Sequence, residues 1–319
     1  MHSSISTARE AHALLRRYFP TTRLVSAPSL SSKSGTVYLK LESDLPTGSF
    51  KPRGALYALS VNMGRRQIDE VTACSTGNHG AAVAFAATQL GIPATIFLPT
   101  HPNPVKRARI AALGAKIVEE GADDLSAAFR QASAYAQKNG VYFLNDATDP
   151  DLPAGPATIA LEILEQLPTT DTIAVPMGDT ALIRGVAAAA KQISPAIKII
   201  GVQAERAPAY YLSWKQGRSL STETCDTIAD GLATRTTDPA NVQAIRSLVD
   251  DVVLVSDDQM LAAIRHLAIV EHIIAEPAGA AATAALMHSA LPPGRDTVLL
   301  VTGANIPPDV LRTAICGRP

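Results

Sequence analysis

Runs of apolar, β-branched residues alternate with longer helical segments along most of this chain, and no other feature restricts the possible folds as much. Strands separated by helices favour a mostly parallel sheet with helices on both faces, which is an α/β fold. Residues 146–156, rich in Asp and Pro, and residues 205–238 interrupt the alternation. The predicted strands are residues 36–41, 71–74, 94–98, 116–119, 141–144, 172–175, 197–202, 251–255 and 297–301. The predicted helices are residues 8–19, 80–90, 104–113, 124–138, 157–166, 181–192, 239–248, 278–288 and 308–315. Asp123 is a candidate cap of helix 124–138, and Ser256 and Gln259 have the spacing of a capping box that opens a further helix.

Composition excludes several classes of protein. The 319 residues are 47% hydrophobic and carry a net charge of −1, so a large core is expected and neither nucleic acid nor an anionic membrane is an expected partner. Residues 80–100 contain no charged side chain, but the Gly91-Ile92-Pro93 break divides them into a helix and a strand rather than a membrane span. Three scattered cysteines (Cys74, Cys225 and Cys316) and the lack of an apolar secretory signal predict a cytoplasmic location, without a disulfide framework or a zinc site.

A lysine, Lys51, follows a predicted strand and a Pro/Gly turn, where α/β proteins often place chemistry. The surrounding string, residues 40–55, reads K-L-E-S-D-L-P-T-G-S-F-K-P-R-G-A. It resembles the lysine segment of pyridoxal-phosphate enzymes of the tryptophan-synthase-β fold (fold type II), and within them the serine/threonine dehydratase and serine racemase branch. The resemblance implies that Lys51 forms the Schiff base with the cofactor and moves the substrate's α-proton, and that Phe50 lies beside the cofactor.

A second motif, residues 74–80, joins a predicted strand to a helix. Unpaired N–H groups at a helix N-terminus can hold an anion, although Ser, Gly and Asn are also ordinary turn and cap residues. The motif resembles the family's S-x-G-N-H loop, which implies a site for the substrate carboxylate and a contact between Asn78 and the cofactor ring. The resemblance assigns His79 no proton transfer, so a structural role is expected for its side chain. The residues implied for substrate binding are Ser75, Thr76, Gly77, Asn78 and His79.

The loop at residues 175–185 also follows a strand and opens a helix, a geometry that suits a phosphate group. The resembling family has a run of glycines here, whereas this chain keeps only Gly178. A carboxylate beside a phosphate is repulsive, so we expect Asp179 to point away from it; an altered substrate pocket is the alternative. The residues implied for cofactor binding in this loop are Gly178, Asp179, Thr180, Ala181 and Leu182.

Two C-terminal motifs complete the resemblance. Thr302, in V-T-G-A-N, corresponds to a hydroxyl that faces the pyridine nitrogen in the family; a neutral hydroxyl there favours β-elimination over transamination. Glu276, in E-P-A-G-A, is expected near the ring, with capping of the next helix as the alternative. Related enzymes often bind a divalent cation through a Glu and an Asp, but Gln203 and Ala209 occupy those positions, so no metal site is predicted.

The alternation of elements and the family resemblance together imply two α/β lobes, each a mostly parallel sheet flanked by helices. Residues 1–52 and 148–319 are expected to form a large cofactor-binding lobe and residues 53–147 a small mobile lobe. The predicted function is a pyridoxal 5'-phosphate-dependent ammonia-lyase that eliminates water from a serine- or threonine-like amino acid, acting as a homodimer. A racemase that uses Lys51 and Thr76 on opposite faces, and a non-catalytic cofactor-binding protein, are the alternatives. Because the sequence stops at Pro319, the regulatory domain of biosynthetic threonine dehydratases is not expected.

Overall fold

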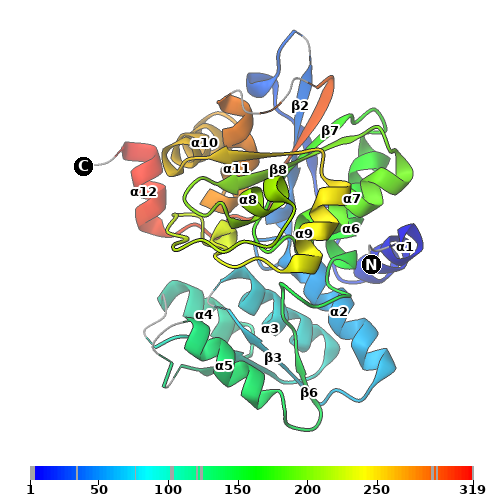
Figure 1. Cartoon of the computed structure of the whole chain (residues 1–319), viewed down its shortest axis with the longest axis vertical. Helices are drawn as coiled ribbons and strands as arrows, with labels where there is room; N and C mark the ends of the chain where they lie inside the picture. The colour runs from blue at the N-terminus through cyan, green and yellow to red at the C-terminus, as the bar shows by residue number, and fades with distance from the viewer. Residues whose placement is uncertain are drawn as a thin grey trace.

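The computed structural model describes residues 4–33, 35–75, 77–100, 104–119, 121–122, 125–288, 291 and 294–317. Its strands form two sheets that are stacked in two lobes, one above the other in Figure 1. The strands are β1 (Leu24–Ser26), β2 (Thr36–Leu41), β3 (Glu70–Cys74), β4 (Ala94–Phe97), β5 (Lys116–Val118), β6 (Val141–Phe143), β7 (Thr172–Pro176), β8 (Lys198–Ala204), β9 (Asp251–Val255) and β10 (Asp296–Val301). The α-helices are α1 (Ile5–Leu15), α2 (Lys51–Arg65), α3 (Asn78–Leu90), α4 (Pro104–Ala112), α5 (Leu125–Tyr135), α6 (Ala154–Gln166), α7 (Ala181–Ile193), α8 (Ala209–Gln216), α9 (Pro239–Leu248), α10 (Asp257–Ile269), α11 (Pro277–Met287) and α12 (Pro308–Cys316).

The larger sheet has the strand order β1-β2-β10-β7-β8-β9, and only the edge strand β1 is antiparallel to its neighbour. Side chains from its two faces enter two different hydrophobic cores. One core packs the sheet against α10, α11 and α12, and the other packs it against α1, α6, α7, α8 and α9. The central strands are therefore buried on both faces, which explains why their sequences are continuously apolar rather than alternating.

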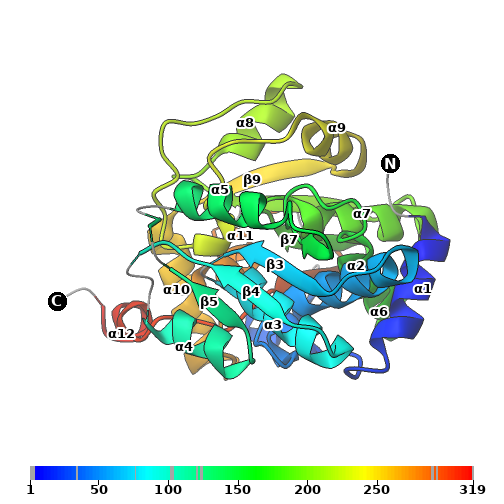
Figure 2. The same cartoon turned by 90° about the horizontal axis from the view of Figure 1, so that it is seen from below.

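The smaller sheet has the order β5-β4-β3-β6, and all its strands are parallel. Helices α2, α3 and α4 contribute to the core on one face, and α5 packs on the other through Ala128 and Ala132. Figure 2 shows the sheet between α5 on one side and α3 and α4 on the other. Both sheets thus have the covered, parallel architecture that the alternation of elements predicts.

Helix α2 lies where the two lobes meet (Figure 1). It packs on α3 of the smaller sheet and on α6 of the larger one. Lys51 is its first residue, so the predicted catalytic lysine lies between the lobes. The division of the chain at residues 52/53 and 147/148 remains a prediction.

Several element boundaries differ from the sequence prediction. Helix α1 begins at Ile5, three residues early, because the Ser4 side chain accepts a hydrogen bond from the Thr7 N–H and caps it. Helix α6 begins at Ala154 and includes Pro156 in its first turn, where a missing N–H costs no hydrogen bond. The stretch predicted to be irregular contains α8, and β1 was not predicted. The capping box of Ser256 and Gln259 is confirmed, whereas Asp123 lies outside the described residues.

Among the described residues, no helix combines the length and the apolar character that crossing a bilayer requires.

Candidate active site

The turn before Lys51 is hydrogen-bonded to the loop that follows β10. The Phe50 N–H donates to the Thr302 carbonyl at 3.0 Å, and the Ala304 N–H donates to the Gly48 carbonyl at 2.9 Å. Gly48 has a φ of +68°, a left-handed conformation that favours glycine. A third bond runs from Asn305 Nδ2 to the Thr47 carbonyl at 2.9 Å, across 258 positions of sequence. These bonds bring the first and last predicted motifs together.

Asn78, at the start of α3, connects the smaller sheet to the same loop. Its side-chain amide donates to Glu276 Oε1 at 2.7 Å and accepts from Asn305 Nδ2 at 2.6 Å. Glu276 Oε2 accepts from the Asn305 N–H at 3.1 Å. The Glu276 side chain makes no cap bond to α11, so its carboxylate orients Asn78 and Asn305 instead of capping that helix. Asn305 was not identified from the sequence, although it ends the V-T-G-A-N motif.

The loop before α7 keeps a backbone shape that suits glycine. Thr180 has a φ of +69°, and its hydroxyl accepts from Arg184 Nε at 3.1 Å. A side chain at Gly178 would collide with the Gly231 carbonyl, 2.2 Å from an added Cβ, so this position needs glycine. Asp179 Oδ1 accepts from the Thr234 hydroxyl at 3.0 Å. The acidic side chain is thus held by a residue of the segment before α9.

Charges around Lys51 are predominantly negative. Its ammonium donates to Asp146 Oδ2 at 2.7 Å, in the loop between β6 and α6. Burial lowers the pKa of Lys51, but the Asp146 carboxylate, helped by Asp179 and Glu276, outweighs burial and raises it. Burial would raise the pKa of Asp146, but the Lys51 ammonium holds it well below its usual range. Asp146 was not a predicted site residue; the sequence marked its loop only as irregular.

The structure brings most of the predicted site residues to this region. Lys51, Asn78, Glu276 and Thr302 belong to one hydrogen-bonded set of loops, and Thr302 is 4% exposed. His79 is buried in α3 and its Nε2 bonds the Leu144 carbonyl at 2.9 Å. Phe50 lies directly before α2, and Ser75 and Gly77 lie before α3. Gly178, Asp179, Thr180, Ala181 and Leu182 lie at the start of α7, from where the Asp179 carboxylate acts on Lys51; Thr76 lies outside the described residues.

Residues 15–303 match the family described as pyridoxal-phosphate dependent enzyme. The chain belongs to this family. An L-threonine ammonia-lyase of Thermotoga maritima is 34% identical over 304 residues, which are 95% of this chain and 76% of the relative. The catabolic L-threonine dehydratase of Escherichia coli strain K12 is 35% identical, covering 85% of this chain and 83% of the relative. A solved structure of maize serine racemase has a TM-score of 0.90 and 28% identity, covering 99% of this chain and 98% of that one.

These similarities confirm the fold type II α/β architecture, the pyridoxal-phosphate cofactor and the relation to the serine/threonine dehydratase branch. The residues present also fit the cofactor. Among the described residues, the buried hydroxyls of Thr47 and Ser49, next to Lys51, have no hydrogen-bond partner and can receive one from a ligand. The start of α7 offers N–H groups for a phosphate, and the Arg184 guanidinium lies beside them.

Asp179 is a carboxylate in the loop that would hold the phosphate, and its charge disfavours phosphate binding. Burial, followed by the nearby Asp146 charge, raises the pKa of Asp179 from 3.8 to about 6. The folded protein therefore binds the Asp179 proton more tightly than the unfolded chain does. The stabilisation that this proton gives to the folded protein is lost as the pH rises from about 4 through about 6. Ionised Asp179 would also repel the cofactor phosphate.

We expect Asp179→Asn to raise the melting temperature of the cofactor-free protein above pH 6, because the amide avoids the cost of ionisation and still accepts from Thr234. The gain should shrink toward zero near pH 4, where wild-type Asp179 is already protonated. Differential scanning calorimetry from pH 4 to pH 8 measures this difference. A gain that is independent of pH would contradict the assigned pKa.

Neither of the two positions at which the sequence comparison places a cation ligand, 203 and 209, carries a carboxylate. Gln203 is buried on β8 and its Oε1 accepts from the Tyr211 N–H at 2.8 Å, while Ala209 begins α8. We expect a chelator to leave activity and melting temperature unchanged, because hard cations need oxygen anions. A chelator-induced loss that magnesium restores would show that other residues bind a cation.

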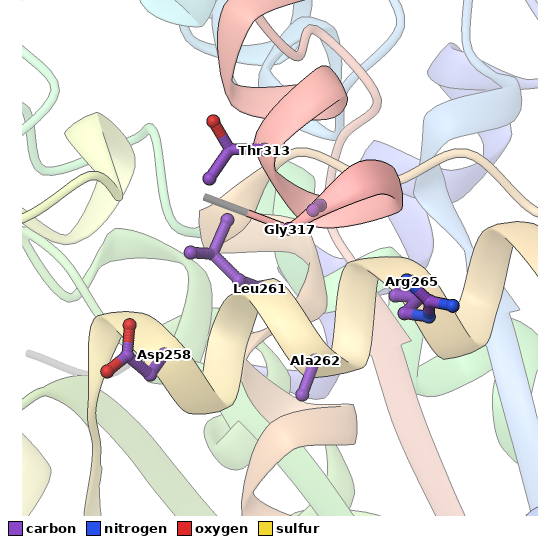
Figure 3. Close-up of a pocket in the computed structure, with 7 residues that line it drawn as sticks. Asp258, Leu261, Ala262, Arg265, Thr313 and Gly317 are labelled. Carbon is purple, nitrogen blue, oxygen red and sulfur yellow. The ribbon is translucent and has the colours of Figure 1, made fainter. Parts of the chain in front are cut away.

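A separate pocket lies between α10 and α12 (Figure 3). Leu261 and Thr313 face each other across it, with Asp258 and Arg265 along α10. None of the predicted site residues lines it. It is therefore distinct from the region around Lys51.

Proposed function

We propose that this protein is a pyridoxal-phosphate-dependent ammonia-lyase that eliminates water from a serine- or threonine-like amino acid and yields a 2-oxo acid and ammonia. The observation that carries the proposal is the joining of Lys51, Asn78, Glu276 and Thr302 by one set of hydrogen-bonded loops. The L-threonine ammonia-lyase of Thermotoga maritima and the L-threonine dehydratase of Escherichia coli support this substrate class.

We assign the residues as follows. The cofactor supplies an electron-withdrawing ring that acidifies the substrate's α-carbon. Lys51 would hold its aldehyde and, as a free amine, remove the α-proton. The start of α7 would hold the phosphate, Asn78 the ring oxygen and Thr302 the ring nitrogen. The backbone around Ser75 and Gly77 would bind the substrate carboxylate.

Lys51 is well placed for proton transfer because its Nζ atom lies 2.7 Å from Asp146 Oδ2, with which it can exchange a proton. Asn78 is oriented on both sides of its amide, by Glu276 and Asn305, so it presents fixed atoms to a ring. Such fixed orientation lowers the cost of binding because little side-chain freedom is lost.

A substrate screen tests the proposal. Purified protein with added cofactor is incubated with the isomers of serine, threonine and larger β-hydroxy amino acids, and 2-oxo acid release is measured with a coupled dehydrogenase. We expect release from at least one of them and equal ammonia formation. Absence of 2-oxo acid from every β-hydroxy amino acid, in protein that has bound cofactor, would overturn the proposal.

Racemisation is the second candidate, and the similarity to maize serine racemase supports it. A racemase needs a proton donor on the face opposite Lys51, and Thr76 carries a hydroxyl. We expect elimination to dominate and Thr76→Ala to remove a minor racemase activity while largely sparing elimination, because a positioned acid contributes about 10²- to 10⁴-fold. Chiral chromatography of the remaining amino acid measures this. Racemisation that exceeds elimination, or that survives Thr76→Ala, would contradict the assignment.

We also propose that residues 53–147 form a small mobile lobe, that residues 1–52 and 148–319 form the cofactor-binding lobe, and that the protein acts as a cytoplasmic homodimer. Helix α2 at the boundary supports the division, since it packs on a helix of each lobe. Light scattering of the purified protein tests the dimer, and limited proteolysis with and without substrate tests the mobility of the small lobe.

A further inference from the structure

Asp146 is the nearest charged group to the reactive nitrogen of Lys51. Its Oδ2 atom lies 2.7 Å from Lys51 Nζ, and the two side chains are 24% and 20% exposed. A carboxylate at this distance can exchange a proton directly with the amine. Asp146 also lies 95 positions from Lys51, in the loop between β6 and α6, so the fold creates this contact.

The loop holds Asp146 in a fixed place. The Asn145 side chain accepts from the Ala147 N–H at 3.0 Å, which makes a local turn around Asp146. The Ala147 carbonyl in turn accepts from Asn241 Nδ2 at 2.9 Å, and Arg184 Nη2 approaches it at 3.4 Å. Residues of α7 and α9 thereby fix the backbone on one side of the carboxylate.

His79 presents a hydrogen-bond acceptor toward the same carboxylate. Because a carbonyl can only accept, the bond from Nε2 to the Leu144 carbonyl places the proton on Nε2 and leaves a lone pair on Nδ1. Nδ1 is buried, has no partner among the described residues and lies 4.0 Å from Asp146 Oδ2; the side chain is 3% exposed. Burial keeps the pKa of His79 below its usual value, so the ring is neutral. Nδ1 is therefore an acceptor toward which Asp146 can turn its O–H once that carboxyl group carries a proton.

The other carboxylates near Lys51 are engaged elsewhere. Asp179 accepts from Thr234, and Glu276 accepts from Asn78 and from the Asn305 backbone. Asp146 alone among these three bonds the Lys51 ammonium directly. It is therefore the carboxylate that can receive the proton that Lys51 removes from a substrate.

We propose that Asp146 is a catalytic acid that protonates the departing β-hydroxyl, with His79 as its positioning residue; this inference rests on the proposed function. Lys51 takes the α-proton, and the electron pair of the Cα–H bond becomes the Cα=Cβ π bond. Lys51 passes that proton to Asp146, which delivers it to the β-oxygen as the Cβ–O bond breaks and its electron pair leaves with oxygen. Water is the leaving group, and no external acid, oxidant or reductant is consumed.

The test compares leaving groups. Chloride departs without a proton, whereas hydroxide does not, so the β-hydroxy amino acid that the screen identifies is compared with its β-chloro analogue. We expect Asp146→Asn to lower the elimination rate of the hydroxy substrate by about 10²- to 10⁴-fold without a comparable loss on the chloro substrate. The quantity compared is the elimination rate on the hydroxy substrate divided by that on the chloro substrate. Both rates are measured in one preparation, so their ratio does not depend on the fraction of protein that folds or binds cofactor.

Matched variants sharpen the comparison. Asp151→Asn removes a carboxylate of the same loop that bonds Asn62 and Arg65 instead of Lys51, and its ratio should equal that of the wild type. Asp146→Glu should restore part of the rate on the hydroxy substrate. His79→Gln should change the ratio in the same direction as Asp146→Asn, which a purely structural role would not do.

A second readout uses cofactor-free protein. Mass spectrometry after brief acetylation at a series of pH values reports the midpoint at which the Lys51 amine becomes reactive, and Asp146→Asn should move that midpoint to lower pH. An unchanged midpoint, or an equal loss on the hydroxy and chloro substrates, would overturn the role of Asp146 and leave the proposed function intact. Failure of the wild type to act on either substrate would overturn the proposed function together with this inference.

Discussion

Replacing Lys51 by alanine is expected to abolish steady turnover, a loss of more than about 10⁴-fold, because one side chain both holds the cofactor and moves the α-proton. The N-terminus of α7 and the Asn78 amide do not depend on Lys51, so reversible cofactor binding should persist. Two measurements check this: 2-oxo acid release, and the mass of the protein after borohydride reduction, which should show covalent cofactor in the wild type only.

Lys215→Ala is the matched control. Lys215 is an exposed lysine of α8, and its ammonium bonds only the Tyr211 hydroxyl among the described contacts. This variant should keep wild-type turnover and covalent labelling. Turnover by Lys51→Ala comparable to that of the wild type would overturn the assignment of the site and of the reaction.

Motifs that are contiguous in sequence were predictable. The turn before Lys51, the residues around Asn78 and the loop around Thr302 each follow a predicted strand, so the parallel architecture places all of them at the carboxyl ends of strands. Recognising them required only short strings of residues. The hydrogen bonds between the loops then follow from the fold, since strands β2 and β10 are direct neighbours.

Asp146 was not predictable in the same way. It belongs to no motif, and what distinguishes its loop from a surface loop is contact with residues distant in sequence, among them Lys51, Asn241 and Arg184. Helix α8 was missed for a related reason. Only three of its eight residues, Ala209, Tyr210 and Ser213, are buried, so its sequence lacks the wide apolar stripe that predicts a helix.

A buried ionic network beneath the site was also invisible in the sequence, although its members Lys40, Glu42 and Arg53 lie within the recognised string. Lys40 and Arg53 share one partner, Glu162 of α6, which lies 122 and 109 positions away in the sequence, and Arg53 also holds Glu42. Arg53 donates to Glu42 at 2.7 Å and to both oxygens of Glu162, at 2.7 and 2.9 Å. Lys40 donates to Glu162 Oε2 at 2.7 Å. The network therefore joins the start of α2, which carries Lys51, to the core of the larger sheet.

Removing Glu162 should be the most destabilising of these substitutions. Glu162→Ala removes the carboxylate that bonds the Lys40 ammonium and part of the Arg53 guanidinium, at positions where both side chains are 0% exposed. Loss of one partner from a buried ion pair costs about 3–5 kcal/mol. We expect a decrease of that size in the free energy of unfolding, measured by urea denaturation at pH 7. Glu165→Ala, an exposed glutamate of the same helix, should change it by less than about 0.5 kcal/mol.

The pH dependence separates lost charge from lost packing in Glu162→Ala. Burial alone would raise the pKa of Glu162, but Arg53 and then Lys40 lower it from 4.5 to about 2. The ionised carboxylate thus stabilises the folded protein above about pH 4.5, and this contribution is lost as the pH falls toward 2. The difference between wild type and variant should therefore shrink steadily across that range. A difference that stays constant from pH 7 to pH 3 would show that Glu162 stabilises α6 by packing, and that its charge is not what holds the start of α2 in place.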